Sequence, residues 1–145
     1  MMTERNKEAV MHQKQLRVRG FHLDVYQHVN NARYLEFLED ARWQFFDDMA
    51  LTPLFCEAKC AMAVINININ YRHSAYFGDD LLIGTYFSRV QSRKAVLTQV
   101  IRLKNTDQVI AEAVVTFIGF DQQAKKAISF PPGLRKKMQA LLLRT

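Results

Sequence analysis

Hydrophobic positions between residues 30 and 49 recur at three- and four-residue intervals, which is the spacing of an amphipathic helix. The apolar stripe consists of Tyr34, Leu38, Ala41, Phe45 and Met49. Neither Pro nor Gly interrupts the run, and Asn30 or Asn31 offers a side-chain oxygen for the N-cap. The pattern therefore predicts one helix of about 19 residues, roughly 28 Å long, which can cross a whole sheet.

Period-two alternation predicts strands on both sides of this helix. The clearest strand covers 61–71, where apolar and Asn positions alternate: Ile65, Ile67, Ile69 and Tyr71 against Asn66, Asn68 and Asn70. A short strand over 14–19 precedes the helix. Three strands, over 81–90, 95–104 and 109–121, follow one another through short connections. A short basic helix is expected over 134–143.

This order of elements defines the fold class. One strand, one long helix, four consecutive strands and a short C-terminal helix predict an α+β fold, with a five-stranded antiparallel sheet wrapped around the long helix. We expect a loose N-terminal tail over 1–12 and a single domain over 13–145. Such a sheet leaves edge strands unpaired, and a second copy would cover an edge. We therefore expect a homodimer with a continuous sheet, and leave open a tetramer of two dimers.

The composition fits a globular protein, at 145 residues, 49% hydrophobic and 23% charged. No apolar run approaches the length of a membrane span, and the polar N-terminus is unlike a secretory signal. We expect a cytoplasmic protein with no membrane partner. The net charge of +6 suits either solubility or an anionic ligand. The basic residues are spread along the chain rather than clustered with aromatics, which argues against nucleic acid.

The sequence lacks the motifs of several large enzyme classes. The chain has no Walker loop, no Gly-rich dinucleotide turn, no HExxH and no GxSxG. Cys56 and Cys60 are four apart with no third or fourth soft ligand nearby, which is too few for a closed zinc site. We expect neither a metal nor an organic cofactor.

The segment HLDVYQHVNN carries the strongest candidate chemistry. Asp24 precedes the helix start by six residues, where free backbone N–H groups around Asn30 and Asn31 can hold an oxyanion. A carboxylate beside such donors is a hydrolytic arrangement. The alternative is that Asp24 caps the turn or pairs with an Arg. We interpret His22 and His28 as residues that hold the loop, with His28 as general base the alternative.

The spacing Asp24-x-x-x-His28-Val29-Asn30-Asn31-x-x-Tyr34, at the opening of a long helix, resembles the hot-dog fold thioesterases of the 4-hydroxybenzoyl-CoA thioesterase class. The stretches RGFHLDVYQHVNNARYLEFLEDARW and VINININYRHSA are most similar to bacterial long-chain acyl-CoA thioesterases of the FadM (YbaW) type. The likeness covers roughly residues 14–140. Gln27 stands where many members of the wider class have Gly before the His.

The resemblance implies hydrolysis of a long-chain fatty acyl-CoA to the free acid and CoA. Asp24 matches the catalytic carboxylate, as general base or nucleophile, and Asn31 matches the residue whose backbone N–H polarises the thioester carbonyl. His28, Asn30 and Tyr34 match the residues that shape this corner. A thiol leaving group with a pKa of about 8.5 departs as thiolate, so no strong general acid is required.

The resemblance also suggests where the rest of the substrate lies. The hairpin with Arg89, Arg93 and Lys94 is where related enzymes hold the nucleotide, and Arg72 is a further candidate for the CoA phosphates. A solvated charge is the alternative for each. The acyl chain would run along the helix near Phe37, Phe45 and Trp43, or into the dimer seam, with core packing the alternative for each aromatic.

Three other functions remain open. The same fold could act on acyl carrier protein or on an aromatic acyl-CoA, or it could bind acyl-CoA without turnover. A dehydratase would need a His/Asp or His/Glu pair, for which His28 is not well placed. Glu36 and Glu39 on the helix are alternative catalytic carboxylates.

Overall fold

The computed structural model describes residues 11–142. The elements, in chain order, are β1 (His12–Arg17), the 3-10 helix η1 (Gly20–His22), α2 (Asn31–Asp48), α3 (Thr52–Glu57), β2 (Ala61–Tyr71), β3 (Asp80–Val90), β4 (Lys94–Leu103), β5 (Val109–Asp121), β6 (Lys126–Ile128) and α4 (Pro132–Ala140).

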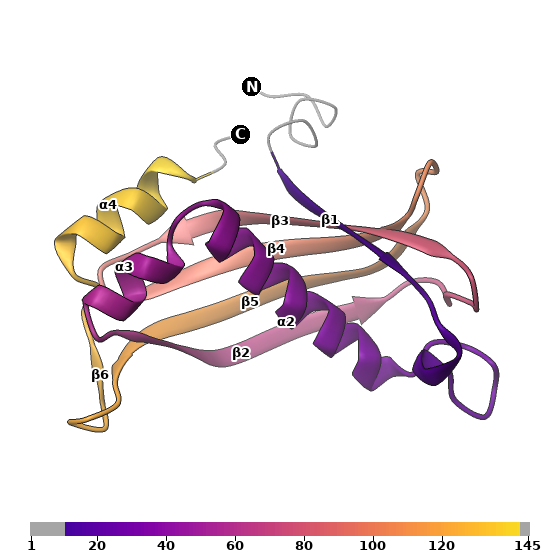
Figure 1. Ribbon diagram of the computed structural model, residues 1–145, viewed down its shortest axis with the longest axis horizontal. Coiled ribbons are helices and arrows are strands. Elements are labelled where there is room, and N and C mark those ends of the chain that lie inside the picture. The colour runs from indigo at the N-terminus through magenta and orange to yellow at the C-terminus, as the bar shows by residue number, and fades with distance from the viewer. Residues whose placement is uncertain (1–10, 143–145) are drawn as a thin grey trace.

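The strands form one antiparallel sheet in the order β1-β3-β4-β5-β2, and α2 lies across one face of it (Figure 1). This confirms the predicted α+β hot-dog arrangement of a sheet wrapped around one long helix. The short strand β6 adds a sixth member, because it pairs with the end of β5. The pattern analysis missed β6, since three residues are too few to show a period. Strands β1 and β2 lie at the two edges of the sheet.

Most predicted boundaries agree with the structure within one or two residues. The C-terminal helix α4 differs most, because it covers Pro132–Ala140 rather than 134–143, and β1 is displaced by two residues at each end. Strand β1 covers His12–Arg17 rather than 14–19, so His12 belongs to the sheet and not to the tail. Its ladder with β3 stops at the pair Arg17–Asp80 because β3 begins there. Residues 1–10 of the predicted tail, and residue 143 of the predicted C-terminal helix, lie outside the described residues.

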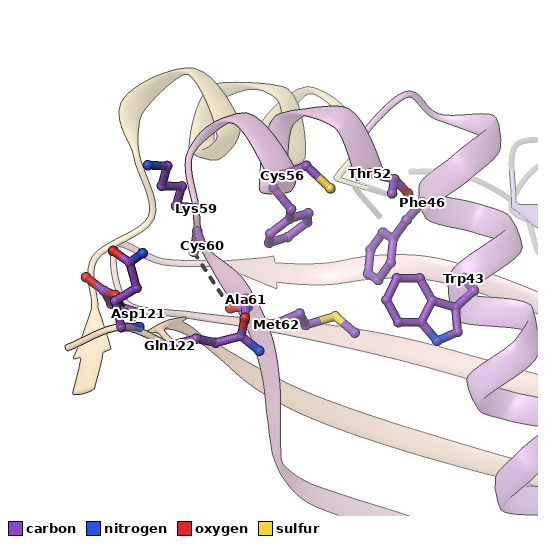
Figure 2. Close-up of a pocket in the computed structure, with 12 residues that line it drawn as sticks. Trp43, Phe46, Thr52, Cys56, Lys59, Cys60, Ala61, Met62, Asp121 and Gln122 are labelled. Carbon is purple, nitrogen blue, oxygen red and sulfur yellow. Dashed lines mark hydrogen bonds between the residues drawn. The ribbon is translucent and has the colours of Figure 1, made fainter. Parts of the chain in front are cut away.

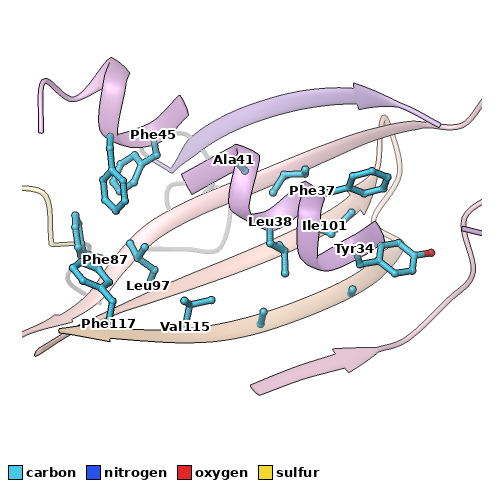
Figure 3. Close-up of a cluster of buried hydrophobic side chains, with 14 of the residues drawn as sticks. Tyr34, Phe37, Leu38, Ala41, Phe45, Phe87, Leu97, Ile101, Val115 and Phe117 are labelled. Atoms are coloured by element: carbon cyan, nitrogen blue, oxygen red, sulfur yellow. The ribbon is translucent and has the colours of Figure 1, made fainter. Parts of the chain in front are cut away.

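The core lies between α2 and the concave face of the sheet (Figure 3). Phe37 and Phe45 are 4% and 3% exposed, so core packing is their role, as the alternative interpretation held. They meet inward side chains of the central strands, which include Leu97, Ile101, Val115 and Phe117. Burial of each such side chain stabilises the fold by about 1.5–3 kcal/mol. Trp43 on the same helix stays 51% exposed.

Three polar side chains, Arg42, Gln99 and Thr85, are hydrogen-bonded to one another within this core. Arg42 Nη1 donates to Gln99 Oε1 over 3.1 Å, and Gln99 Nε2 donates to Thr85 Oγ1 and to the Leu38 carbonyl, each over 3.0 Å. Burial lowers the pKa of Arg42. Within residues 11–142, no carboxylate forms a salt bridge with it. Within the described residues, Gln99 is therefore the only side chain that accepts a hydrogen bond from this buried cation, and Arg42 Nε has no partner there.

The edge strand β2 departs from strict alternation at one point. Its register against β5 shifts between Val64 and Asn66, a β-bulge that leaves Ile65 unpaired and 57% exposed. Ile65 therefore does not share the half-buried face of Ile67 and Ile69, contrary to the period-two pattern. The Asn face of β2 is exposed along its length.

Candidate active site

A tight loop between η1 and α2 holds Asp24. The Tyr26 N–H donates to Asp24 Oδ1 over 2.9 Å, which is an Asx turn, and the Gln27 N–H donates to the Asp24 carbonyl over 3.0 Å. The Asp24 N–H in turn donates to the His28 carbonyl over 2.9 Å. One carboxylate oxygen of Asp24 therefore fixes the side chain. The other, Oδ2, accepts no hydrogen bond from the described residues.

Gln27 closes this turn in an unusual backbone conformation. Its φ angle is +65°, in the left-handed region that glycine enters without steric cost. A non-Gly residue loses roughly 1–2 kcal/mol there. The substitution of Gln for the Gly of the wider class therefore leaves the loop in a conformation typical of glycine.

The start of α2 supplies one free backbone donor. Asn30 is the N-cap, as predicted, and its Oδ1 accepts the Ala32 N–H over 2.9 Å. The Asn30 N–H donates to the His22 carbonyl over 3.0 Å, and the Arg33 N–H to the Asn30 carbonyl over 2.8 Å. The Asn31 N–H has no acceptor among residues 11–142. At a helix N-terminus such a donor favours negative charge on an approaching oxygen.

Tyr34 ties the helix start to the connection between β2 and β3. Its hydroxyl accepts the buried Ala75 N–H over 3.1 Å, so the hydroxyl proton is left to donate. Burial raises the pKa of Tyr34, which keeps it protonated. Beside it, the Tyr71 hydroxyl donates to the Asn31 carbonyl over 3.3 Å, and the Tyr34 and Tyr71 rings lie 5.7 Å apart.

The two histidines of the loop have different surroundings. His22 is 8% exposed, its Nδ1 accepts the Arg19 N–H over 2.9 Å, and burial lowers its pKa. It is therefore a neutral residue that holds the loop, which confirms that interpretation. His28 is exposed to the site, with Nδ1 3.4 Å from Ser74 Oγ and its ring edge-on to Tyr76 at 5.2 Å.

These side chains open onto a single cleft of about 640 Å³ at the N-terminal end of α2. The predicted residues that line it are Asp24, His28, Asn30, Asn31, Tyr34 and Arg72. Tyr71 and Ser74 are among the residues that the structure adds. Local spacing carries no separate signal for these two, because Tyr71 is the last residue of a predicted strand and Ser74 is an ordinary turn residue.

The other basic candidates lie elsewhere in the chain. Arg93 lies in the β3–β4 turn and Lys94 is the first residue of β4, at the opposite end of the sheet from Arg72, and Arg89 lies near the end of β3. The ten residues of β4 that separate the two ends span roughly 30 Å. Of the four basic candidates, only Arg72 lines the cleft, and it pairs with Glu112.

The alternative helix carboxylates do not line the cleft. Glu36 accepts Arg33 Nη1 over 2.7 Å as an exposed i,i+3 ion pair, and Glu39 is exposed. Across residues 11–142, no three His, Cys, Asp or Glu side chains gather as a metal site would require. No helix in that range is long and apolar enough to span a membrane.

The fold and the cleft, with the Asp24 loop at the start of the long helix α2, can now be compared with known protein families. Residues 18–138 match the family described as the thioesterase-like superfamily, and the chain belongs to it. The chain is 43% identical over 130 residues to the long-chain acyl-CoA thioesterase FadM of Escherichia coli (strain K12), across 90% of this chain and 98% of that protein. The predicted resemblance is thereby confirmed.

Solved structures agree. The crystal structure of the probable thioesterase YbaW from Escherichia coli has a TM-score of 0.83 at 43% identity, covering 92% of this chain and 99% of that one. A probable thioesterase from Bartonella henselae has a TM-score of 0.71 at 28% identity, covering 83% of this chain and 98% of that one.

Proposed function

We propose that this protein hydrolyses long-chain fatty acyl-CoA to the free acid and CoA, with Asp24 as the catalytic carboxylate and the Asn31 N–H as the oxyanion donor. One observation carries the proposal. The cleft contains a carboxylate with one oxygen fixed and one free, next to a helix-terminal N–H that has no acceptor in the described chain. The long-chain specificity is supported by the name of the 43% identical relative.

The chemistry needs little more than these two groups. With Asp24 as general base, Oδ2 accepts a proton from water while the water oxygen attacks the thioester carbonyl carbon. The carbonyl oxygen becomes an oxyanion, which the Asn31 N–H and the positive end of α2 stabilise. The C–S bond then breaks and CoA leaves as a thiolate, which is stable enough to need no strong acid. With Asp24 as nucleophile, the same oxygen attacks the carbon and water later hydrolyses the anhydride.

The assembly that we propose is a homodimer through β2, built from one domain over 13–145 of each protomer, in the cytoplasm. β2 is hydrogen-bonded to β5 on one side only, and it exposes Asn66, Asn68 and Asn70. A twofold axis at this edge extends the sheet and brings the far end of the partner's sheet near the cleft. Arg89, Arg93 and Lys94 would then hold CoA phosphates from the partner's side. A monomeric mass by sedimentation at micromolar protein would contradict this assembly.

The experiment that tests the function measures thiol release from a panel of acyl-CoAs, acyl carrier thioesters and an aromatic acyl-CoA. Wild type is compared with Asp24→Asn and with Glu36→Gln as the matched carboxylate control. Asn keeps the Oδ1 that accepts the Tyr26 N–H, so the Asx turn persists while the base and nucleophile are lost. We expect long-chain acyl-CoA to be hydrolysed, with kcat at least about 100-fold lower in Asp24→Asn.

Other outcomes have distinct meanings. Equal release by wild type and Asp24→Asn would remove Asp24 from the mechanism and direct attention to Glu36 and Glu39. Faster turnover of acyl carrier or aromatic thioesters would overturn the substrate class but keep the mechanism. Tight acyl-CoA binding without thiol release from any thioester would leave a binding module in place of an enzyme.

A further inference from the structure

A second cavity, of about 610 Å³, lies at the other end of α2. It opens between the C-terminal half of α2, helix α3 and the beginning of β2 (Figure 2). Trp43, Phe46, Phe55, Cys56 and Met62 form its apolar side. The polar lining residues include Lys59, from the turn before β2, and Asp121, at the end of β5.

The fold itself does not require this cavity. Protein interiors are close-packed, and an apolar hollow that water can enter sacrifices both packing and burial. Trp43, the largest side chain in the lining, is 51% exposed although it belongs to the core helix. A concave, mostly apolar pocket of this size is typical of a site for an apolar ligand.

We propose that this pocket binds the distal end of the substrate's acyl chain while the thioester lies in the Asp24 cleft of the partner protomer. The inference rests on the proposed function and deepens it, because it assigns the residues that select chain length. The ligand class is an unbranched hydrocarbon chain. Met62 suits it, since a thioether side chain is flexible enough to adapt to chains of different length.

The capacity of the pocket fits a long chain. A cavity of about 150 Å³ holds one benzene molecule, with six carbons. A volume of 610 Å³ is about four times larger, so it accommodates well over ten methylene groups. A short acyl chain would leave most of the pocket unoccupied and would gain little binding free energy from it.

The symmetry of the proposed dimer decides which cleft the pocket serves. In a twofold contact, residue i of one strand faces residue j of the partner only if j also faces i. When the same edge strand meets itself about a twofold axis perpendicular to the sheet, which keeps both concave faces on one side, the two copies run antiparallel. Ala61 and Met62, at the pocket, then lie beside the Tyr71 end of the partner's β2, at the partner's cleft.

The cleft of the same protomer lies at the opposite end of α2. Along α2, Asn31 is separated from Trp43 and Phe46 by 12 and 15 residues (43 − 31 and 46 − 31), or roughly 18–22 Å. A palmitoyl chain whose thioester sits at its own protomer's Asn31 would have to be fully extended to reach even the Trp43 edge of this pocket.

The native thiol of Cys56 provides a direct measure of occupancy. Cys56 is exposed and lines the pocket, whereas Cys60 is buried. We expect saturating palmitoyl-CoA, added to Asp24→Asn so that it is not consumed, to slow alkylation of Cys56 by iodoacetamide at least tenfold. Acetyl-CoA at the same occupancy should not slow it. Peptide mass spectrometry reads Cys56 separately from Cys60. Equal protection by both thioesters, or by neither, would contradict the assignment.

Filling the pocket tests its role in specificity. Cys56→Phe should lower the ratio of kcat/KM for palmitoyl-CoA over hexanoyl-CoA at least tenfold, because only the long chain needs the space. Gln139→Phe, which adds the same side chain at an exposed position of α4, controls for a general effect of the substitution and should keep the wild-type ratio. An unchanged ratio in Cys56→Phe, in an enzyme that still hydrolyses acyl-CoA, would overturn the pocket assignment and leave the proposed function intact.

Mixed dimers test the crossing of the chain between protomers. Dimers of Asp24→Asn alone, or of Cys56→Phe alone, should be slow with palmitoyl-CoA. Co-expressed heterodimers, purified through two different tags, contain one site with an intact Asp24 facing an intact partner pocket. We expect them to regain about half of the wild-type palmitoyl-CoA activity. No regain would mean that each cleft uses its own pocket. A wild-type enzyme inert towards every thioester would overturn the proposed function as well.

Discussion

Replacement of Gln99 by Leu tests how the core tolerates a buried cation. The side chain accepts from Arg42 and donates to Thr85 Oγ1 and the Leu38 carbonyl, and it is completely buried. The Leu38 carbonyl keeps its intrahelical hydrogen bond, so the most costly loss is the hydrogen bond of the Arg42 guanidinium. A hydrogen bond to a charged group is worth about 1.5–3 kcal/mol, and an abandoned buried donor costs about 1–3 kcal/mol. We expect Gln99→Leu to lower the free energy of unfolding by about 3 kcal/mol.

The partner substitution completes a double-mutant cycle. Arg42→Met leaves the Gln99 oxygen unsatisfied but removes a charge from the core, so we expect a loss of only about 1–2 kcal/mol. The double variant removes both partners and should cost about 1 kcal/mol. The coupling energy, the sum of the two single losses minus the loss in the double variant, is then about 3–4 kcal/mol. It would be measured by urea unfolding at one fixed protein concentration, because assembly shifts apparent stability. Additivity within about 0.5 kcal/mol would refute the view that Gln99 exists to satisfy Arg42.

Two further predictions concern the Asp24 loop and the edge of the sheet. Gln27→Gly removes the strain of the left-handed φ angle but makes the unfolded chain more flexible. We therefore expect its free energy of unfolding to equal that of wild type or exceed it by up to about 1 kcal/mol. In the same urea unfolding assay, the free energy of unfolding of Gln27→Val should be at least about 1 kcal/mol lower than that of Gln27→Gly. Equal stability of the two variants would show that the left-handed angle is not maintained. The hydrogen bond from Arg17 lowers the pKa of Asp80 below its ordinary 3.8. The stability from this pair is therefore present above pH 4 and lost as the pH falls below it, so the wild-type urea midpoint should fall more steeply than that of Asp80→Asn between pH 5 and pH 2.

The elements that sequence analysis located well are those with a long local period. Helix α2 repeats its apolar stripe over four turns and begins at a side-chain cap, and strands β2 and β5 have the predicted bounds. The three-residue strand β6 has no period to detect. The sequence alternates regularly through Ile65, although the register shift there leaves this residue unpaired and exposed.

The residues of the candidate site were likewise predicted where they lie close together in the sequence. Asp24 and Asn31 are seven residues apart, so one local motif indicated both. Tyr71 and Ser74 reach the cleft only because β2 returns to the start of α2 across the sheet. Such a contact has no trace in local spacing. The placement of Arg72 and Arg93 at opposite ends of the sheet, by contrast, already follows from the predicted strand over 81–90, which runs from one end of the sheet to the other between them.

The buried residue Ala75 has a consequence for the order in which a newly made chain becomes active. Its carbonyl accepts the Val29 N–H over 3.0 Å and its N–H donates to the Tyr34 hydroxyl over 3.1 Å, so both the end of the Asp24 loop and the first turn of α2 are hydrogen-bonded to it. Translation adds about 5–20 residues per second, and 44 residues (75 − 31) separate Asn31 from Ala75. For roughly 2–9 seconds the ribosome therefore carries the complete segment from Asp24 to Asn31 without the residue that anchors it. Under the proposed mechanism, a nascent chain of this length cannot hydrolyse acyl-CoA, since the proposed site is assembled only once the β2–β3 connection has been made.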